Sequence, residues 1–121
     1  MDSRFLNVDL DVRCRAGVAP LLRALGKTVM VLHAEETWAS LELSGPQPSS
    51  AEEAIKRYAK LVRALSTRGK AAWRRCDART MNIGVEAGTV QEAGVYSLDR
   101  ATLRLLDALA ADVVFTVYPT R

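Results

Sequence analysis

The side chain best suited to acid–base or metal chemistry in this sequence is a histidine. His33 is the only histidine, and Glu35 and Glu36 follow it closely. A histidine beside carboxylates can act as a general base or as a metal ligand. A histidine metal site needs further ligands, however, and the stretch "HAEE" is equally typical of a solvated hairpin turn. We therefore expect neither catalysis nor metal binding at His33.

Two carboxylates, Asp9 and Asp11, form the other group that could do chemistry. Alternate residues of a strand share a face, and the strand rise places these carboxylates about 7 Å apart, a spacing that paired acid–base catalysts use. The same alternation explains them as the polar face of a half-buried strand. The sequence also lacks the G-x-S-x-G, P-loop, G-x-G-x-x-G and H-E-x-x-H motifs. We therefore expect a protein that is not an enzyme and that has no catalytic residue, metal or cofactor.

Positive charge is concentrated in one segment of the chain. Residues 56–79 carry nine basic side chains and one acidic side chain, a net charge of +8, whereas the other residues carry eight basic and thirteen acidic ones, a net charge of −5. Such a polarised distribution steers an anionic partner, either protein or nucleic acid, towards one surface. The alternative is an ordinary solvated helix face, in which Glu52 and Lys56 form an ion pair.

Two tryptophans and the basic side chains are the candidate residues for binding a partner. Tryptophan is enriched both in protein cores and at interface hot spots, and a core position is the alternative for each of the two. Trp38 alternates with Ser40 and Glu42, which predicts that its ring lies on the polar face of a strand. The predicted partner-binding residues are Lys56, Lys60, Arg63, Trp73, Arg74, Arg75 and Trp38.

Size and composition are typical of one globular domain, which we expect to span residues 1–121, with 49% apolar and 26% charged residues. The longest apolar runs are far shorter than the roughly 20 residues that cross a bilayer, and the first residues lack the pattern of a secretory signal. These features predict a cytoplasmic protein without a membrane segment. Cys14 and Cys76 are too few and too far apart for a disulfide framework or a zinc site, so we expect buried free thiols.

The first half of the sequence predicts three strands and one helix. Residues 6–12 alternate between apolar and polar side chains, which is typical of a strand. A short amphipathic helix follows over 18–25, where apolar residues recur at i, i+3, i+4 and i+7. Residues 28–34 and 37–44 predict two antiparallel strands that the "HAEE" turn joins.

The middle of the sequence predicts a basic amphipathic helix over about 50–68, which begins with the capping pattern of a serine and a glutamate three residues later. Residues 70–77 form either a further helical turn, which we favour, or an irregular approach to the next strand, and periodicity over eight residues does not decide between them. The stretch 87–99 then predicts a turn, a short strand around Val95 and Tyr96, and a serine or aspartate cap for the last helix.

Two stretches of the sequence resemble each other. "RFLNVDLDV" and "RTMNIGVEA" share an arginine, an asparagine and the same alternation, and residues 21–32 share leucines, alanines and an apolar strand pattern with 105–116. This similarity predicts two β-α-β halves, about 4–43 and 79–119, joined by the basic helix, although convergence on a common pattern is the alternative. We expect an α+β fold with a mixed sheet of about five or six strands, helices on one face and pseudo-duplicated halves.

A further pattern runs through the C-terminal half of the chain. It consists of Trp73, Arg79, Asn82-Ile83-Gly84, Tyr96, Leu98 and the stretch from Val113 to Pro119. The pattern resembles a family of small uncharacterised bacterial α+β proteins. The resemblance implies a stand-alone cytoplasmic protein without assigned enzymatic activity, and some small proteins of this kind are immunity partners of toxins. It implies no catalytic residue.

These observations predict a non-enzymatic protein-binding module, an immunity-type protein that neutralises a toxin through complementary shape and charge. One alternative is a small-molecule sensor or regulatory domain, with a ligand cleft between the halves or between two protomers. The other is weak nucleic-acid binding along residues 56–79, with Trp73 as a stacking ring. The sequence leaves the strand order and the oligomeric state open, and a homodimer is compatible with it.

Overall fold

The computed structural model describes residues 3–88 and 93–120, which form four α-helices and a five-stranded mixed sheet. In chain order the elements are β1 (Arg4–Arg13), α1 (Ala19–Leu25), β2 (Val29–Ala34), β3 (Trp38–Leu43), α2 (Ala51–Arg63), α3 (Thr67–Arg75), β4 (Ala78–Glu86), α4 (Arg100–Leu109) and β5 (Asp112–Tyr118). A 3₁₀ turn, Gly26–Thr28, connects α1 to β2. The predicted α+β fold class is confirmed, as is the helix expected within 70–77.

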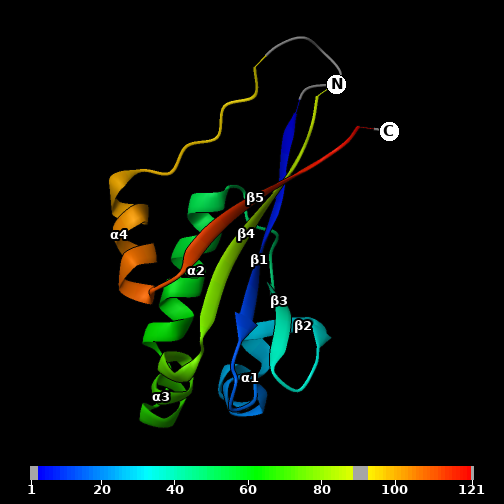
Figure 1. Ribbon diagram of the computed structural model, residues 1–121. Coiled ribbons are helices and arrows are strands. Elements are labelled where there is room, and N and C mark those ends of the chain that lie inside the picture. Colours follow the sequence, from blue (N-terminus) through cyan, green and yellow to red (C-terminus); the bar gives the residue numbers. More distant parts are fainter. Residues whose placement is uncertain (1–2, 89–92, 121) are drawn as a thin grey trace.

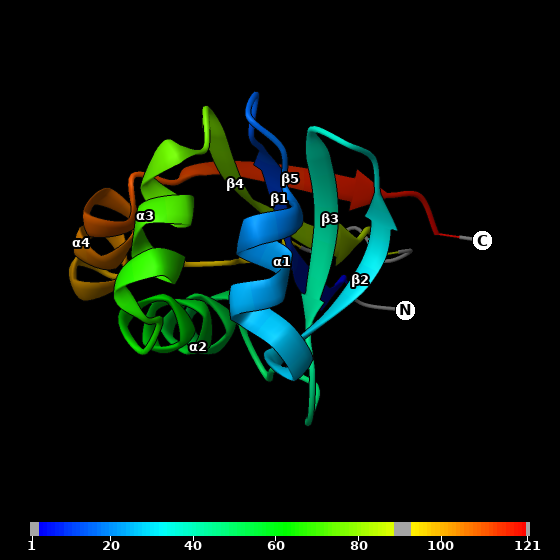
Figure 2. The same ribbon diagram turned by 90° about the horizontal axis from the view of Figure 1, so that it is seen from below.

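The strands are ordered β2-β3-β1-β4-β5 across the sheet. β1 pairs antiparallel with both β3 and β4, β2 pairs antiparallel with β3, and β4 pairs parallel with β5. The predicted hairpin of β2 and β3 is therefore confirmed. The helices lie together on one face of the sheet, and the opposite face is not covered by any described helix (Figures 1 and 2).

Side-chain alternation in the central strands separates these two faces. In β1, Val8, Leu10 and Val12 are buried under the helices, whereas the residues between them are only partly buried. β3 and β4 alternate in the same way. Because alternate side chains of a strand point to opposite faces, one face of the sheet supplies the apolar core and the other remains in contact with water.

A β-bulge near the start of β1 corrects one detail of the predicted strand. Phe5 pairs with Val85 and Asn7 pairs with Gly84, so that Leu6 is an extra residue between the two pairs. The predicted alternation places Leu6 on the core face, but the bulge shifts the register by one residue there. Phe5 therefore points to the core face instead.

Tyr58 joins the helix layer to the centre of the sheet. Its side chain is 1% exposed, and its hydroxyl donates a hydrogen bond of 2.8 Å to the backbone oxygen of Val8. The apolar stripe that includes Ile55, Tyr58 and Val62 faces inward, as the sequence predicts. α2 is thus the helix that packs over the middle of the sheet.

Three of the four helices, α2, α3 and α4, begin at side chains that accept hydrogen bonds from their first turns. Ser50 accepts from the backbone nitrogen of Glu53 at 3.1 Å, which confirms the predicted start of α2. Asp99 accepts from the backbone nitrogen of Thr102 at 2.8 Å, so the aspartate is the cap of the last helix. Such caps satisfy backbone donors that have no partner inside the helix.

The structure does not show the predicted duplication. β4 and β5 are adjacent and parallel, with α4 as their connection, whereas β3 lies between β1 and β2. The two β-α-β units therefore differ in strand order. The short strand predicted around Val95 and Tyr96 is also wrong, since residues 93–99 have no regular secondary structure and both side chains are exposed.

A disulfide between Cys14 and Cys76 corrects the expectation of two free thiols. The two cysteines are 62 residues apart in sequence, but the end of β1 and the end of α3 meet at the same end of the sheet. Backbone contacts support the junction, because the nitrogen of Asp77 donates to the oxygen of Arg13 at 2.7 Å. The nitrogen of Arg15 donates to the Asp77 carboxylate, also at 2.7 Å.

Reduction of this disulfide should destabilise the protein. A bond that closes so long a loop restricts the unfolded chain, and we expect the free energy of unfolding to fall by about 2–4 kcal/mol in reductant. The measurement is urea unfolding with and without dithiothreitol. The double variant Cys14→Ala/Cys76→Ala is the control and should not respond to the reductant. Two titratable thiols in the native, unreduced protein would contradict the assignment.

Candidate functional site

The basic segment lies on the outer side of the helix layer. Its residues belong to α2, α3 and the start of β4. Seven of its nine basic side chains are exposed: Lys56, Lys60, Arg63, Arg68, Lys70, Arg74 and Arg75. No ion pair among the described residues involves any of these seven. Glu52, which could pair with Lys56, instead accepts hydrogen bonds from the Asp99 nitrogen and the Thr102 hydroxyl at the start of α4.

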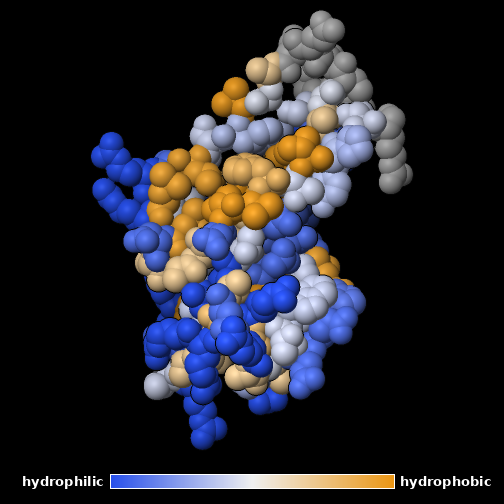
Figure 3. All heavy atoms as spheres, in the orientation of Figure 1, coloured by the Kyte–Doolittle hydropathy of each residue, from blue (hydrophilic) through white to orange (hydrophobic). Residues whose placement is uncertain are grey.

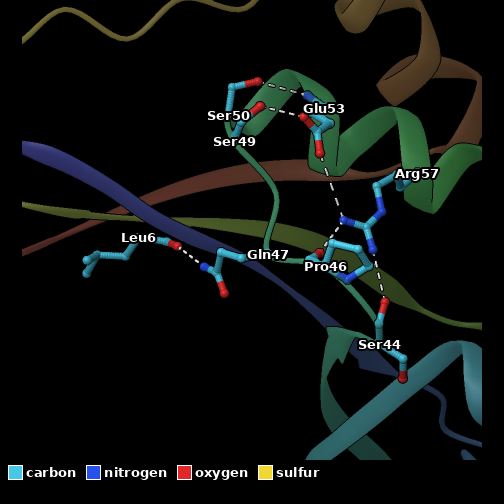
Figure 4. Close-up of polar contacts among 8 residues, drawn as sticks. All are labelled: Leu6, Ser44, Pro46, Gln47, Ser49, Ser50, Glu53 and Arg57. Atoms are coloured by element: carbon cyan, nitrogen blue, oxygen red, sulfur yellow. Dashed lines mark hydrogen bonds and ion pairs between the residues drawn. The ribbon is translucent and has the colours of Figure 1, made fainter.

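Arg57 is one of the two basic residues that serve the fold. Its guanidinium donates to the backbone oxygens of Pro46 and Ser44 at 2.6 and 2.9 Å, and thereby holds the loop before α2 (Figure 4). Gln47 of the same loop donates to the backbone oxygen of Leu6 at 2.5 Å. Arg57 is therefore occupied by the loop, and its charge is only partly available to a partner.

Arg79 is the other basic residue that serves the fold. Its Nη1 donates to the backbone oxygens of Trp73 and Cys76 at 2.9 and 2.8 Å, and its Nε donates to that of Ala110 at 3.0 Å. The guanidinium carbon also lies 5.7 Å from the centre of the Trp73 ring. Arg79 thus satisfies carbonyl groups at the ends of both α3 and α4, where the helices leave acceptors without partners.

Trp73 is one of the predicted partner-binding residues, but it is not an exposed anchor. Its side chain is only 5% exposed, and its indole nitrogen donates to the backbone oxygen of Leu109 at 3.2 Å. The alternative core position is correct, because α4 covers the ring. The ring still reaches the surface at one place, where it forms part of the floor of a groove.

This groove, which we call the α2–α4 groove, has a volume of about 280 Å³. Its floor is apolar and its rim is basic. Val62, Trp73, Leu105, Ala108 and Leu109 form the floor, and Arg63, Lys70 and Arg74 form the rim. The structure therefore brings together three of the predicted residues, Arg63, Trp73 and Arg74. The contribution of α4 was missed, although the apolar spacing of Leu105 and Leu109 indicates a face of α4 that packs against a neighbour.

The other predicted residues lie elsewhere. Lys56 and Lys60 line a shallow hollow of about 380 Å³ along α2, next to Glu52 and Glu53. Arg75 lines a separate groove between α1 and α3. Trp38 lies on the uncovered face of the sheet, where it is partly buried, as its alternation predicts.

The groove between α1 and α3 has a volume of about 560 Å³ and is also basic. Arg23, Arg68 and Arg75 line it, and Gly69 lies at its floor. A Cβ atom on Gly69 would lie 3.0 Å from the Cβ of Ala24, so the absence of a side chain allows α3 to approach α1 closely. Arg23 was not predicted, because it lies outside the basic segment.

The uncovered face of the sheet has the opposite charge. Burial and repulsion from Asp11 and Glu42 raise the pKa of Asp9 to about 6. His33 stacks on Trp38, with ring centres 4.8 Å apart, and lies 3.2 Å from a carboxylate oxygen of Glu35.

The groups first considered for catalysis are not brought into contact. Ser40 of β3 pairs with both His33 and Asp11, so these two lie two strands apart, roughly 10 Å by strand spacing. Among the described residues, no group of three or more histidine, cysteine, aspartate or glutamate side chains is arranged to hold a metal ion. None of the described helices is both long and apolar enough to cross a membrane.

The chain matches no protein-family model, no curated protein and no solved structure. The resemblance to a family of small bacterial α+β proteins therefore stays a prediction.

Replacement of Arg79 should destabilise the helix layer. Arg79→Ala leaves three carbonyl groups without their charged donor, and we expect the free energy of unfolding to fall by about 2–3 kcal/mol. Arg79→Lys should recover part of the loss. Arg75→Ala, which removes an exposed arginine nearby, is the control and should change stability by less than about 0.5 kcal/mol. Equal effects of the two alanine variants in urea unfolding would contradict the role given to Arg79.

Removal of the Asp9 charge should stabilise the protein at neutral pH. The folded-state pKa of about 6 lies above the ordinary value of 3.8, so the folded protein binds more protons between these values and loses stability as the pH rises through them. Asp9→Asn should therefore be more stable than wild type at pH 7, by about 1 kcal/mol because the half-buried carboxyl remains partly solvated, with little difference near pH 4. Glu36→Gln is the exposed control. Parallel pH profiles of Asp9→Asn and wild type in thermal unfolding would refute this assignment.

Proposed function

We propose that this protein is a non-enzymatic module that binds another protein through its helix layer. The partner inserts an apolar side chain into the α2–α4 groove, and its acidic side chains pair with the basic rim. Neutralisation of a toxin by an immunity-type protein is the biological role that this mode of binding fits best.

The observation on which this proposal rests is the composition of the α2–α4 groove. An apolar floor surrounded by charged side chains is the usual arrangement of an interface hot spot, where a rim excludes water from a central anchor. Arg63, Lys70 and Arg74 are exposed and have no ion-pair partner among the described residues. The carboxylates of an acidic partner can therefore pair with these three side chains without breaking an ion pair between described residues.

A protein is a better partner for this surface than a nucleic acid. Proteins that bind single strands stack bases on exposed rings, and Trp73, the aromatic residue of the groove, presents only 5% of its surface. The apolar floor offers nothing to a phosphate. A nucleic-acid duplex would be bound only through its phosphates, without sequence discrimination, and this binding would depend steeply on salt.

The charge distribution supports fast association with an acidic partner. The basic side chains of α2 and α3 lie on one side of the core, and Asp9, Asp11 and Glu42 lie on the other face of the sheet. Charges separated in this way orient an approaching acidic protein towards the helix layer, chiefly by raising the association rate.

The sequence predicts a cytoplasmic location for this protein. The disulfide between Cys14 and Cys76 favours an oxidising compartment instead, because disulfides are rare in the cytosol. A partner toxin would then be met after or during export. The binding surface itself does not depend on the compartment.

The proposal is tested by affinity capture from the native host with the wild-type chain as bait, followed by identification of the captured protein. We expect one acidic protein in stoichiometric amount. The triple variant Arg63→Glu/Lys70→Glu/Arg74→Glu should weaken its binding by at least about 100-fold, or about 2.7 kcal/mol, with a lower association rate at low salt.

The control variant Arg13→Glu/Arg15→Glu/Lys27→Glu makes the same change of charge at exposed positions outside the groove. It should retain nearly full affinity. Equal losses in both variants, captured material that nuclease removes, or no stoichiometric protein would each overturn the proposal.

A further inference from the structure

In the part of the chain that the structure describes, the large exposed apolar side chains lie in three places. Two are the edge strands β2 and β5, and the third is the segment that leads into α4 and its first turns. Among the described residues they are Met30, Val31, Leu32, Val95, Tyr96, Leu103, Val114, Phe115, Val117 and Tyr118. On one side of the molecule, apolar side chains gather in a band over β5 and the adjoining part of α4 (Figure 3).

The two edge strands differ in how they are protected from other strands. β2 has a bulge between Val31 and His33 and ends at the carboxylates of the following turn. β5 pairs with β4 in unbroken register from Asp112 to Tyr118, and its only charged residue is Asp112 at the first position. Bulges and charges are the usual means by which natural proteins block edge strands. β5 has neither in its interior.

The free side of β5 presents backbone groups to a further strand. The backbone oxygen of Tyr118 accepts a hydrogen bond of 2.9 Å from Ala87 and therefore points towards β4. Because backbone groups alternate along a strand, those of Val113, Phe115 and Val117 point away from β4. No described backbone hydrogen bond from outside the sheet reaches them.

The same edge is apolar on both faces of the sheet. Val114 and Tyr118 share a face with Asn82 and Glu86, and they are 45% and 49% exposed. Phe115 and Val117 point to the helix face, yet they are 49% and 61% exposed because no described helix covers this part of the strand. A partner strand would remove both faces from water.

We propose that β5 is a homodimerisation edge, at which β5 of a second copy adds in antiparallel orientation to form one continuous ten-stranded sheet. A two-fold axis through the middle of β5 makes the contact self-complementary, since Phe115 then faces Phe115 of the other copy and each Val113 faces a Val117. The two Asp112 carboxylates fall at opposite ends of the pair, so the antiparallel arrangement contains no like-charge contact. A parallel arrangement would place them side by side.

The exposed charges of α4 favour the same two-fold arrangement. Arg100 and Arg104 lie in its first half and Asp107 lies in its second half, and all three are exposed. No described ion pair involves them. A two-fold axis reverses the direction of the second α4, so it turns the acidic half of one helix towards the basic half of the other.

The size of the patch indicates a weak dimer. The two exposed aromatic and two exposed aliphatic side chains of β5 offer on the order of 400 Å² of apolar surface per copy, the size of a large patch on a monomer and below the roughly 800 Å² per partner of a standard interface. We expect a dissociation constant in the micromolar range, with the α2–α4 groove left free in both copies.

Sedimentation equilibrium of the full chain from about 5 to about 500 µM tests the proposal, a range that brackets micromolar dissociation. The weight-average mass should rise from 13.2 kDa towards twice that value. Val117→Pro removes a backbone donor that faces away from β4 and should weaken dimerisation about tenfold or more. Val117→Thr keeps the donor and the branched shape, and should dimerise like wild type.

A second pair of variants distinguishes this edge from any other contact. Phe115→Lys and Phe115→Glu should each be monomeric, because the two-fold axis brings like charges together, and an equimolar mixture of the two should dimerise again. Thermal unfolding confirms that each variant is folded. A mass of 13.2 kDa for wild type at all concentrations, or dimers that persist in Val117→Pro and Phe115→Lys, would overturn the proposal.

Discussion

The packing of every described helix against one face of the sheet is the constraint on which the rest of the structure depends. Alternation in β3, in β4 and in β1 beyond its bulge makes one face apolar and leaves the other polar. Because the basic segment forms the outer side of α2 and α3, an uneven charge along the sequence becomes an uneven charge in space. The helix layer is positive and the open sheet face collects carboxylates. The protein therefore presents two surfaces of opposite charge to any partner.

Within the helix layer, the basic residues divide into those that hold the fold and those that face water. Arg57 holds the loop before α2, and Arg79 satisfies the carbonyl ends of α3 and α4 beside Trp73. These two are partly buried and donate to backbone oxygens, whereas the others are exposed and lack ion-pair partners among the described residues. The floor of the α2–α4 groove exists because Trp73 is packed between helices rather than displayed. The same packing that removes Trp73 as an exposed anchor creates the place where a partner's side chain can bind.

The sequence predicts the elements well because each depends on local periodicity. The strand at 6–12 and the basic helix both follow from the spacing of apolar residues. Local periodicity does not predict contacts between segments that are distant in the sequence. The disulfide of Cys14 with Cys76 depends on where two elements end, and the groove depends on α4 packing against α2. The structure does not show the expected repeat for a related reason, since the strand order, which no local pattern encodes, places β3 between β1 and β2.

The central claim is that a protein partner covers the α2–α4 groove, and amine labelling of the complex tests it most directly. Lys70 lies on the rim of the groove, and Lys27 lies outside it in the turn after α1, with both side chains exposed. The complex with the captured partner is treated with an amine-reactive reagent, and the extent of modification at each lysine is read by mass spectrometry. The account predicts that the partner protects Lys70 and leaves Lys27 as reactive as in the free protein. Equal modification of Lys70 in the free and bound protein would contradict it.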